Sequence, residues 1–317
     1  MAASRADTPA PNRREFWLAV LSGLAAASIW GGWPAISRLG MQSELDVFDL
    51  TAIRYTTSGL LLLPVLWRLG LRPAAPDSRP GSARNQTNQT NRTRAPIPWL
   101  ALALLIYGAG APYLLLAAGG LNFAPAAHFG VVGPSTMLLV TSFCGWLWQG
   151  DRFDGPRLSG MLLILGGIAV SGVDGLRSGI QKDSGDLAGL DGGRVAFGDL
   201  LFVLAGLAWA AYTLSARHWR FSALHSIAVV GVGSLVLYTP LYLAWHAIFG
   251  EGLPALYAKY AREADNVLFQ SLFQGVLSAF LALFLYTRAV SALGAARGAV
   301  FAALVPGAAT LMAIPLL

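Results

Sequence analysis

The composition of this 317-residue chain fits lipid better than water as its main surroundings. Apolar residues make up 55% of the chain and charged residues 12%, whereas a soluble domain carries about 25% charged residues because its surface must be wetted. The net charge of +6 does not indicate nucleic-acid binding, since the arginines lie between apolar runs and form no single basic patch. The lone cysteine, Cys144, excludes an internal disulfide and a cysteine-cluster metal site.

The chain opens with a polar tail over residues 1–15, which an apolar run over 16–37 follows. Ala25-Ala26-Ala27 within this run resembles the small-residue cleavage site of a signal peptide. The apolar run continues past these alanines, however, and has a counterpart later in the chain. We therefore expect a retained membrane helix behind a cytoplasmic N-terminal tail.

Further apolar runs recur along the whole chain, and nine of them are long enough to cross a membrane. A hydrocarbon layer of about 30 Å needs roughly 20 apolar residues per helix, and a helix satisfies its own backbone hydrogen bonds in lipid. The sequence thus predicts an all-α integral membrane protein. The predicted spans are 16–37, 48–68, 97–118, 126–149, 157–174, 197–216, 225–247, 267–287 and 298–317.

Positive charges between these spans predict the orientation of the chain. With the N-terminus inside, the inner segments hold fifteen Lys and Arg residues and the outer segments hold six. Positively charged residues accumulate on the cytoplasmic side of membrane proteins. We therefore expect a multi-pass protein with a cytoplasmic N-terminus.

The connection between the second and third spans is unusual, because residues 76–96 are rich in Pro, Ser, Arg, Asn and Thr and cannot bury enough apolar surface to fold. It contains three tandem glycosylation sequons by pattern, beginning at Asn85, Asn88 and Asn91. The surrounding arginines place it inside, where no glycosylation occurs, so a disordered cytoplasmic insertion with a low-complexity repeat is the favoured interpretation.

An internal repeat relates the two halves of the chain. Trp30-Gly-Gly-Trp33 with Arg38 recurs 179 residues later as Trp209-Ala-Ala-Tyr212 with Arg217. A second similarity, at an offset of 172, matches the segment 121–134 with 293–306. If five spans form one unit, the second copy must enter the membrane upside down. Inverted repeats that meet at the midplane are a recurring plan of alternating-access transporters.

These segments also resemble a known family. The stretch Ala26–Gly32, the pair Arg54-Tyr55 at the second span and the segment Ala296–Pro306 are similar to an EamA-type member of the drug/metabolite transporter superfamily. The resemblance runs from about residue 16 to the end of the chain. It implies ten helices in a 5+5 plan, a central cavity lined by the first four helices of each repeat, and export of small metabolites or amino-acid-like solutes.

The resemblance divides the chain into a first repeat over 16–174, an external linker over 175–196 and a second repeat over 197–317. The insertion over 76–96 departs from the family pattern. The family pattern also continues into a tenth helix, the partner of residues 157–174, which we expect to be missing by truncation. The expected fold is therefore an inverted repeat with nine spans present and the tenth missing at the C-terminus.

Nine residues are candidates for lining the substrate cavity. Arg54 is the one charge away from the ends of the predicted spans, which indicates a functional site, although its long side chain could instead extend to the interface. The aromatic pairs on spans one and six share a helix face and could line a cavity, pack the core or form an interfacial belt. The candidates are Trp30, Trp33, Arg54, Tyr113, His128, Trp209, Tyr212, Gln270 and Gln274.

His128 could bond substrate or titrate during transport, and a packed neutral histidine is the favoured alternative. Gln270 and Gln274 lie one turn apart and could bond either a polar solute or a neighbouring helix. No Asp or Glu lies in the middle of a predicted span, so carboxylate-based proton coupling has no evident carrier.

The chain has no phosphate-binding loop with Lys and no metal or hydrolytic cluster by spacing. We therefore predict a secondary transporter with no cofactor, no metal and no catalytic residue, in the plasma membrane (the inner membrane of a bacterium). Its expected partners are a small-molecule substrate and the lipid bilayer, with a homodimer left open and no nucleic acid. A non-transporting membrane scaffold or receptor of the same fold is the alternative function, and a membrane enzyme is the third.

Overall fold

The computed structural model describes residues 13–72, 98–149 and 192–293, with short stretches between 155 and 167 and between 300 and 312. Within these ranges every regular element is a helix. Seven segments are long and apolar enough to cross a membrane. This confirms the predicted all-helical membrane class. The predicted spans 157–174 and 298–317, the insertion 76–96 and most of the linker 175–196 lie largely or wholly outside the described residues, so the count of nine stays a prediction.

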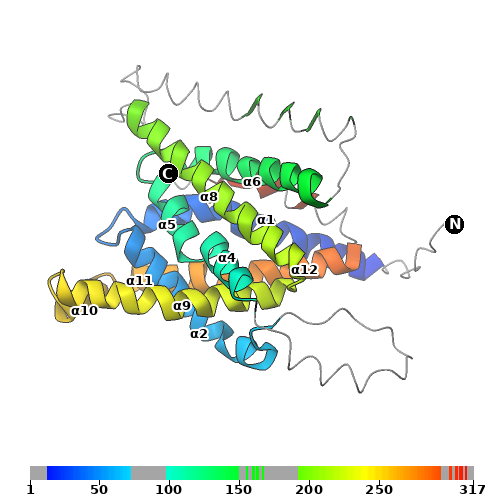
Figure 1. The fold of residues 1–317 in the computed structure, drawn as a ribbon. Helices are drawn as coiled ribbons and strands as arrows, with labels where there is room; N and C mark the ends of the chain where they lie inside the picture. The colour runs from blue at the N-terminus through cyan, green and yellow to red at the C-terminus, as the bar shows by residue number, and fades with distance from the viewer. Residues whose placement is uncertain are drawn as a thin grey trace.

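Figure 1 labels the α-helices of the two halves. In the first half they are α1 (Arg13–Gly40), α2 (Val47–Leu69), α4 (Trp99–Ala109), α5 (Ala111–Gly120) and α6 (Ala126–Gln149). In the second half they are α8 (Gly192–His218), α9 (Ala223–Ile248), α10 (Leu253–Arg262), α11 (Ala264–Gln270), the π-helix η2 (Ser271–Leu281) and α12 (Ala282–Leu293).

The predicted third span is not one continuous helix, because it breaks at Gly110 into α4 and α5. Pro112 follows in the first turn of α5 and cannot donate a backbone hydrogen bond. Side chains satisfy the backbone groups beside the break: the Tyr55 hydroxyl donates to the Ala109 carbonyl at 2.8 Å, and the Ala111 N–H donates to Ser234 Oγ at 3.2 Å. Neighbouring helices thus supply the partners that lipid cannot.

The predicted eighth span also departs from a simple α-helix. It begins as α11, continues for eleven residues as the π-helix η2, and returns to α-helix in α12. The backbone N–H of Ala282 accordingly bonds the carbonyl of Leu277, five residues earlier. π-Helical segments are rare and frequently occur at functional sites.

Packing between the halves follows a reciprocal pattern. Of the described helices, α2 and α9 pack together most extensively. A methyl group on Gly59 of α2 would lie 2.6 Å from Leu235 Cβ of α9, so this small residue allows the close approach. In addition, α1 packs on α12, and α8 packs on α4 and α5 (Figure 1).

The surface of the described helices is apolar where it turns away from the bundle. Leu60 of α2 is 58% exposed and Leu241 of α9 is 69% exposed. Exposed leucines along two mutually packed helices are what a lipid-facing surface requires. The interior, by contrast, holds polar groups, and these define the candidate site.

Candidate functional site

A stripe of buried polar side chains runs down one face of α11 and η2. Gln270, Gln274 and Ser278 are spaced four residues apart, and all three are buried. Burying an amide or hydroxyl costs free energy unless the group finds hydrogen-bond partners. The stripe therefore directs attention to the residues of α1 and α2 that face it.

Gln274 is the centre of this network, and its amide makes four hydrogen bonds. Its Oε1 accepts from Trp33 Nε1 at 2.7 Å and from Arg54 Nη1 at 2.9 Å. Its Nε2 donates to Ser37 Oγ at 2.9 Å and to Gln270 Oε1 at 3.2 Å. Indole and guanidinium nitrogens only donate, so the orientation of the amide is fixed by its partners. One side chain thus joins α1 and α2 of the first half to η2 of the second.

Arg54 turns its charge into the bundle. Its Nη1 donates to Gln274 and, at 3.4 Å, to Ser278 Oγ. Its Nε is buried and has no hydrogen-bond partner among the described residues. Arg54 lies seven residues after the start of α2, about 10 Å along the axis. The sequence left two orientations open for this side chain, and the structure shows it bonded between helices instead of extended to the interface.

Trp30 and Trp33 both donate to η2. The indole Nε1 of Trp30 bonds the Ser278 carbonyl at 3.2 Å, and its ring lies 5.4 Å from the ring of Tyr286. A return from five-residue to four-residue hydrogen bonding leaves one carbonyl without a helical donor. A side-chain donor at this position is therefore well placed to satisfy the backbone of η2.

Aromatic rings fill the space between these polar groups and the second half. Tyr113 and Trp209 have ring centroids 4.8 Å apart, and Trp209 and Tyr212 are 5.4 Å apart. On the other side, Trp33 meets Phe129, whose ring centroid is 5.1 Å away. The small residue Gly108 leaves no room for a methyl group against Ala208 and Tyr212, which lets α4 approach α8 closely.

His128 belongs to a different contact. Its Nδ1 lies 2.9 Å and 3.2 Å from the two carboxylate oxygens of Asp199, which links α6 to α8. Both side chains are partly exposed, at 11% and 17%. The nine predicted residues thus fall into a hydrogen-bonded group around Gln274, an aromatic group around Trp209, and His128 with Asp199.

A second charged cluster, which we call the Asp49 cluster, consists of Asp49, Tyr242, Lys259 and Tyr260. Lys259 Nζ donates to Asp49 Oδ2 at 2.6 Å, and the Tyr242 hydroxyl donates to Asp49 Oδ1. The Tyr260 hydroxyl lies 3.1 Å from that of Tyr242. Asp49 is buried, and with Asp46 it also forms the capping box that begins α2. The cluster joins α2 to α9 and α10.

Sequence reasoning missed the Asp49 cluster, Asp199 and the hydroxyls of Ser37 and Ser278. Asp46-x-x-Asp49 before an apolar run is a helix-start pattern, and it signals a cap without signalling a buried ion pair. Asp49 lies in the first turn of α2, and Asp199 lies near the start of the predicted span 197–216, so a search for charges in the middle of the predicted spans finds neither. The serines carry no sequence signal of their own.

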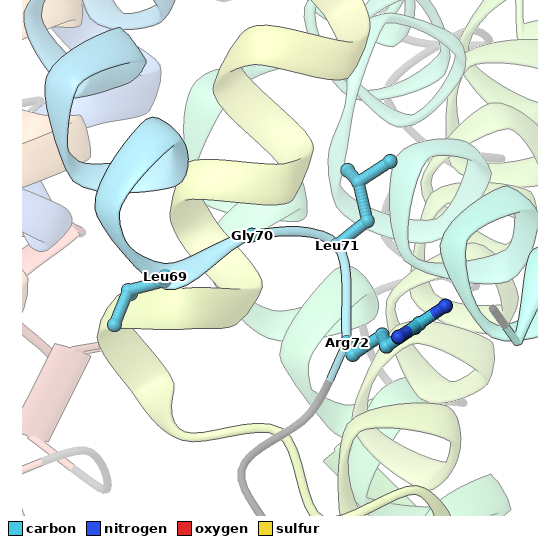
Figure 2. A pocket seen from close by; sticks show the side chains of 4 residues that line it. All are labelled: Leu69, Gly70, Leu71 and Arg72. Atoms are coloured by element: carbon cyan, nitrogen blue, oxygen red, sulfur yellow. The ribbon is translucent and has the colours of Figure 1, made fainter. Parts of the chain in front are cut away.

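The recess drawn in Figure 2 lies elsewhere, at the other end of α2. It is shallow, has a volume of about 320 Å³ and is lined by Leu69, Gly70, Leu71 and Arg72. His225 Nε2 lies 2.8 Å from the Gly70 carbonyl. Four consecutive residues at a helix end lack the converging polar groups of a ligand site.

Comparison with known proteins identifies the family. Residues 17–173 match the model of the EamA-like transporter family. This segment belongs to the EamA-like transporter family. The family lies in the drug/metabolite transporter superfamily, so the resemblance stated from the sequence is confirmed. Members of the family are transporters and not enzymes. With its apolar helices, the chain is a multi-pass membrane protein of this family.

Individual proteins add little about function. A relative from Pseudomonas aeruginosa, described as uncharacterized protein PA1977, is 30% identical over 208 residues, which is 65% of this chain and 57% of the relative. The chain therefore matches just over half the length of that relative. A solved structure described as "Crystal structure of protein" covers 94% of this chain and 99% of its own, at 20% identity and a TM-score of 0.43. A likeness this weak carries no inference.

Proposed function

We propose that this EamA-family chain is a secondary transporter that exports small metabolites or amino-acid-like solutes through a central site around Gln274. The observation that carries the proposal is the Gln274 amide, which bonds Trp33, Ser37 and Arg54 from the first half while standing on η2 of the second. A polar site shared by two halves is where relative motion of those halves changes access to a bound solute.

The proposed mechanism is alternating access between two inverted repeats of five helices. The reciprocal packing supports it, because α1 packs on α12 as α8 packs on α4 and α5. The described residue Ala308 adds a further parallel. A methyl group on Gly31 of α1 would lie 2.5 Å from Ala308 Cβ, a close approach that corresponds to the packing of α8 on α6. If the two halves are equivalent, each contact made by a helix of one half should have a counterpart made by the matching helix of the other half.

The third helix of each proposed repeat also departs from a regular α-helix. In the first half the departure is the break at Gly110, and in the second it is the π-helical hydrogen bonding of η2. Broken helices are typical of substrate sites in secondary transporters, and π-helical segments frequently occur at functional sites. The positive-inside count further supports a cytoplasmic N-terminus in a bacterial plasma membrane.

Flux through proteoliposomes tests the proposal. The full chain is reconstituted in vesicles loaded with radiolabelled proteinogenic amino acids and small organic acids, and release is compared with protein-free vesicles. We expect at least one solute to be released, and we expect Gln274→Ala to slow its release by roughly tenfold or more, because the shared amide bonds are lost. Gln42→Ala, on the exposed connection before α2, is the matched control and should leave the rate unchanged.

Two results would count against this function. The first is a folded wild-type chain that releases no solute of the panel above the protein-free rate. The second is release that Gln274→Ala and Gln42→Ala affect equally, since the site would then lie elsewhere.

A further inference from the structure

We infer that the solute bound at this site carries a carboxylate, which docks on the Arg54 guanidinium, and an apolar body. The inference rests on the proposed function and narrows its substrate to organic monoanions. Arg54 carries a positive charge within a membrane-spanning helix, and its hydrogen-bond partners among the described residues are neutral.

Arg54 has only neutral partners. Gln274 and Ser278 accept from its Nη1, and its guanidinium carbon lies 5.9 Å from the centroid of the Tyr55 ring. No carboxylate of the described residues forms an ion pair with it. A charge that is removed from water without a counter-ion destabilises the folded protein. A bound anion would supply the missing counter-charge.

Two carboxylates of the described helices, the buried Asp49 and the partly exposed Asp199, already have partners. Asp49 bonds Lys259 and Tyr242, and Asp199 bonds His128. Rearrangement of a neighbouring acid toward Arg54 would therefore break an existing contact. Among the contacts of the described helices, no carboxylate supplies the counter-charge for Arg54, and a bound anion would supply it.

The geometry of the guanidinium specifies how an anion would bind. Nη1 is occupied by Gln274 and Ser278, and the buried Nε has no partner among the described residues. Nε–H and the N–H of Nη2 that lies on the same side form one edge of the guanidinium. Two parallel N–H groups match the two oxygens of a carboxylate. The occupied Nη1 thus holds the plane in place and leaves the Nε edge for the ligand.

The surroundings limit the rest of the solute. Trp33 and Tyr55 are buried beside the site, and Trp30 is partly buried on the same face of η2. Among the residues that bond Gln274, Arg54 is the only one with a charge. One positive charge balances one carboxylate, whereas a dianion would bring an uncompensated charge into the bundle. The site therefore fits a monoanion with an apolar or aromatic body.

Benzoate and benzamide are the matched probes, because they share a ring and differ in charge. Binding to the purified full chain is measured by calorimetry and by the shift of its thermal midpoint. We expect benzoate to bind and stabilise the wild type, and benzamide to bind roughly tenfold to a hundredfold more weakly. Arg54→Gln should abolish this preference. Arg194→Gln, an exposed arginine of α8, is the control and should retain it.

Two further variants keep the test decisive if Arg54→Gln folds poorly. Arg54→Lys retains the charge and loses the two-pronged edge, so benzoate should bind more weakly while the fold persists. Gln274→Glu places a carboxylate 2.9 Å from Nη1, at the position of the present Oε1. It should weaken benzoate binding, because Arg54 then has an internal counter-ion.

Several outcomes would overturn the inference. They are equal binding of benzoate and benzamide by the wild type, no binding of benzoate, and a benzoate response that survives in Arg54→Gln. A midpoint shift that needs Arg54 but is produced only by phosphatidylglycerol would assign the site to a lipid phosphate and would also overturn it.

The two proposals fail in distinguishable ways. Arg54-dependent benzoate binding without flux of any solute would support the anion site and contradict the proposed transport function. Solute flux that Gln274→Ala slows, combined with equal binding of benzoate and benzamide, would support the transport function and contradict the inferred substrate class.

Discussion

Two regions of the bundle each hold a buried charge, and they handle it in opposite ways. In the Asp49 cluster, the carboxylate accepts hydrogen bonds from Lys259, from Tyr242 and from the backbone N–H of Asp46. At the central site, Arg54 bonds two neutral side chains and keeps an unpartnered Nε among the described residues. A charge that is fully compensated within the protein holds helices together, whereas an uncompensated one is available to a ligand.

The largest expected effect is loss of the compensated charge. Asp49→Ala should lower the free energy of unfolding by about 3–5 kcal/mol, because Lys259 is left without its partner and the α2 cap is broken. Denaturant or heat unfolding in detergent, followed by circular dichroism, measures the change. Glu44→Ala, which replaces an exposed acid on the connection before α2, is the control. Equal stability of the two variants would show that the cluster does not fasten α2.

Removing the uncompensated charge should have the opposite sign. Arg54→Met should leave the free energy of unfolding unchanged or raise it by about 1–4 kcal/mol, because a desolvated charge is replaced by an apolar side chain of similar length. The same unfolding experiment measures it, and solute binding should be lost in parallel. A clear destabilisation would mean that Arg54 is mainly a structural group, and the contrast with Asp49 would then disappear.

The His128–Asp199 contact should fall between these two extremes. Asp199→Ala removes an acceptor from a partly exposed pair that links α6 to α8. We expect the free energy of unfolding to fall by about 1–2 kcal/mol while Gln274-dependent flux persists. A loss of flux with unchanged stability would instead give this pair a part in transport.

The smallest effect is expected at the exposed pair of Glu44 and Arg262, whose Oε2 and Nη2 lie 2.7 Å apart. The hydrogen bond from Arg262 lowers the pKa of the Glu44 carboxyl below its ordinary value. Because the folded pKa is the lower one, the contribution is complete above the ordinary pKa and is lost as the pH falls through the lowered value.

Thermal midpoints measured at about pH 6 and about pH 3, compared between wild type and Arg262→Gln, test this pair. The wild type should lose slightly more stability than the variant on acidification, and high salt should reduce the difference. An identical pH response in both chains would show that the exposed pair contributes nothing measurable.

The sequence predicted those features of the molecule that depend on the bilayer. Hydrocarbon imposes a length on each span and requires helical hydrogen bonding, so the membrane class and most span positions followed from the apolar runs. The outliers Arg54, Gln270 and Gln274 were also visible, because polar residues inside such runs are uncommon. In each case the signal is local to one segment.

Only the tertiary structure decided what these residues contact. The sequence showed Pro112 but not the break at Gly110, whose backbone groups are bonded by Tyr55 and Ser234 from distant helices. It gave no sign of the π-helix η2, which aligns Gln274 with Arg54 across 220 residues of chain. It placed Asp49 at a helix start without its partner Lys259, 210 residues away.

The physical reason is the same for all three. Span length and polarity are properties of consecutive residues, whereas the partner of a buried charge depends on which helices the packing brings together. The sequence alone therefore determined that this is a multi-pass helical membrane protein with an arginine inside a span. Packing decided that Asp49 is compensated within the protein and that the Nε of Arg54 has no acceptor among the residues described.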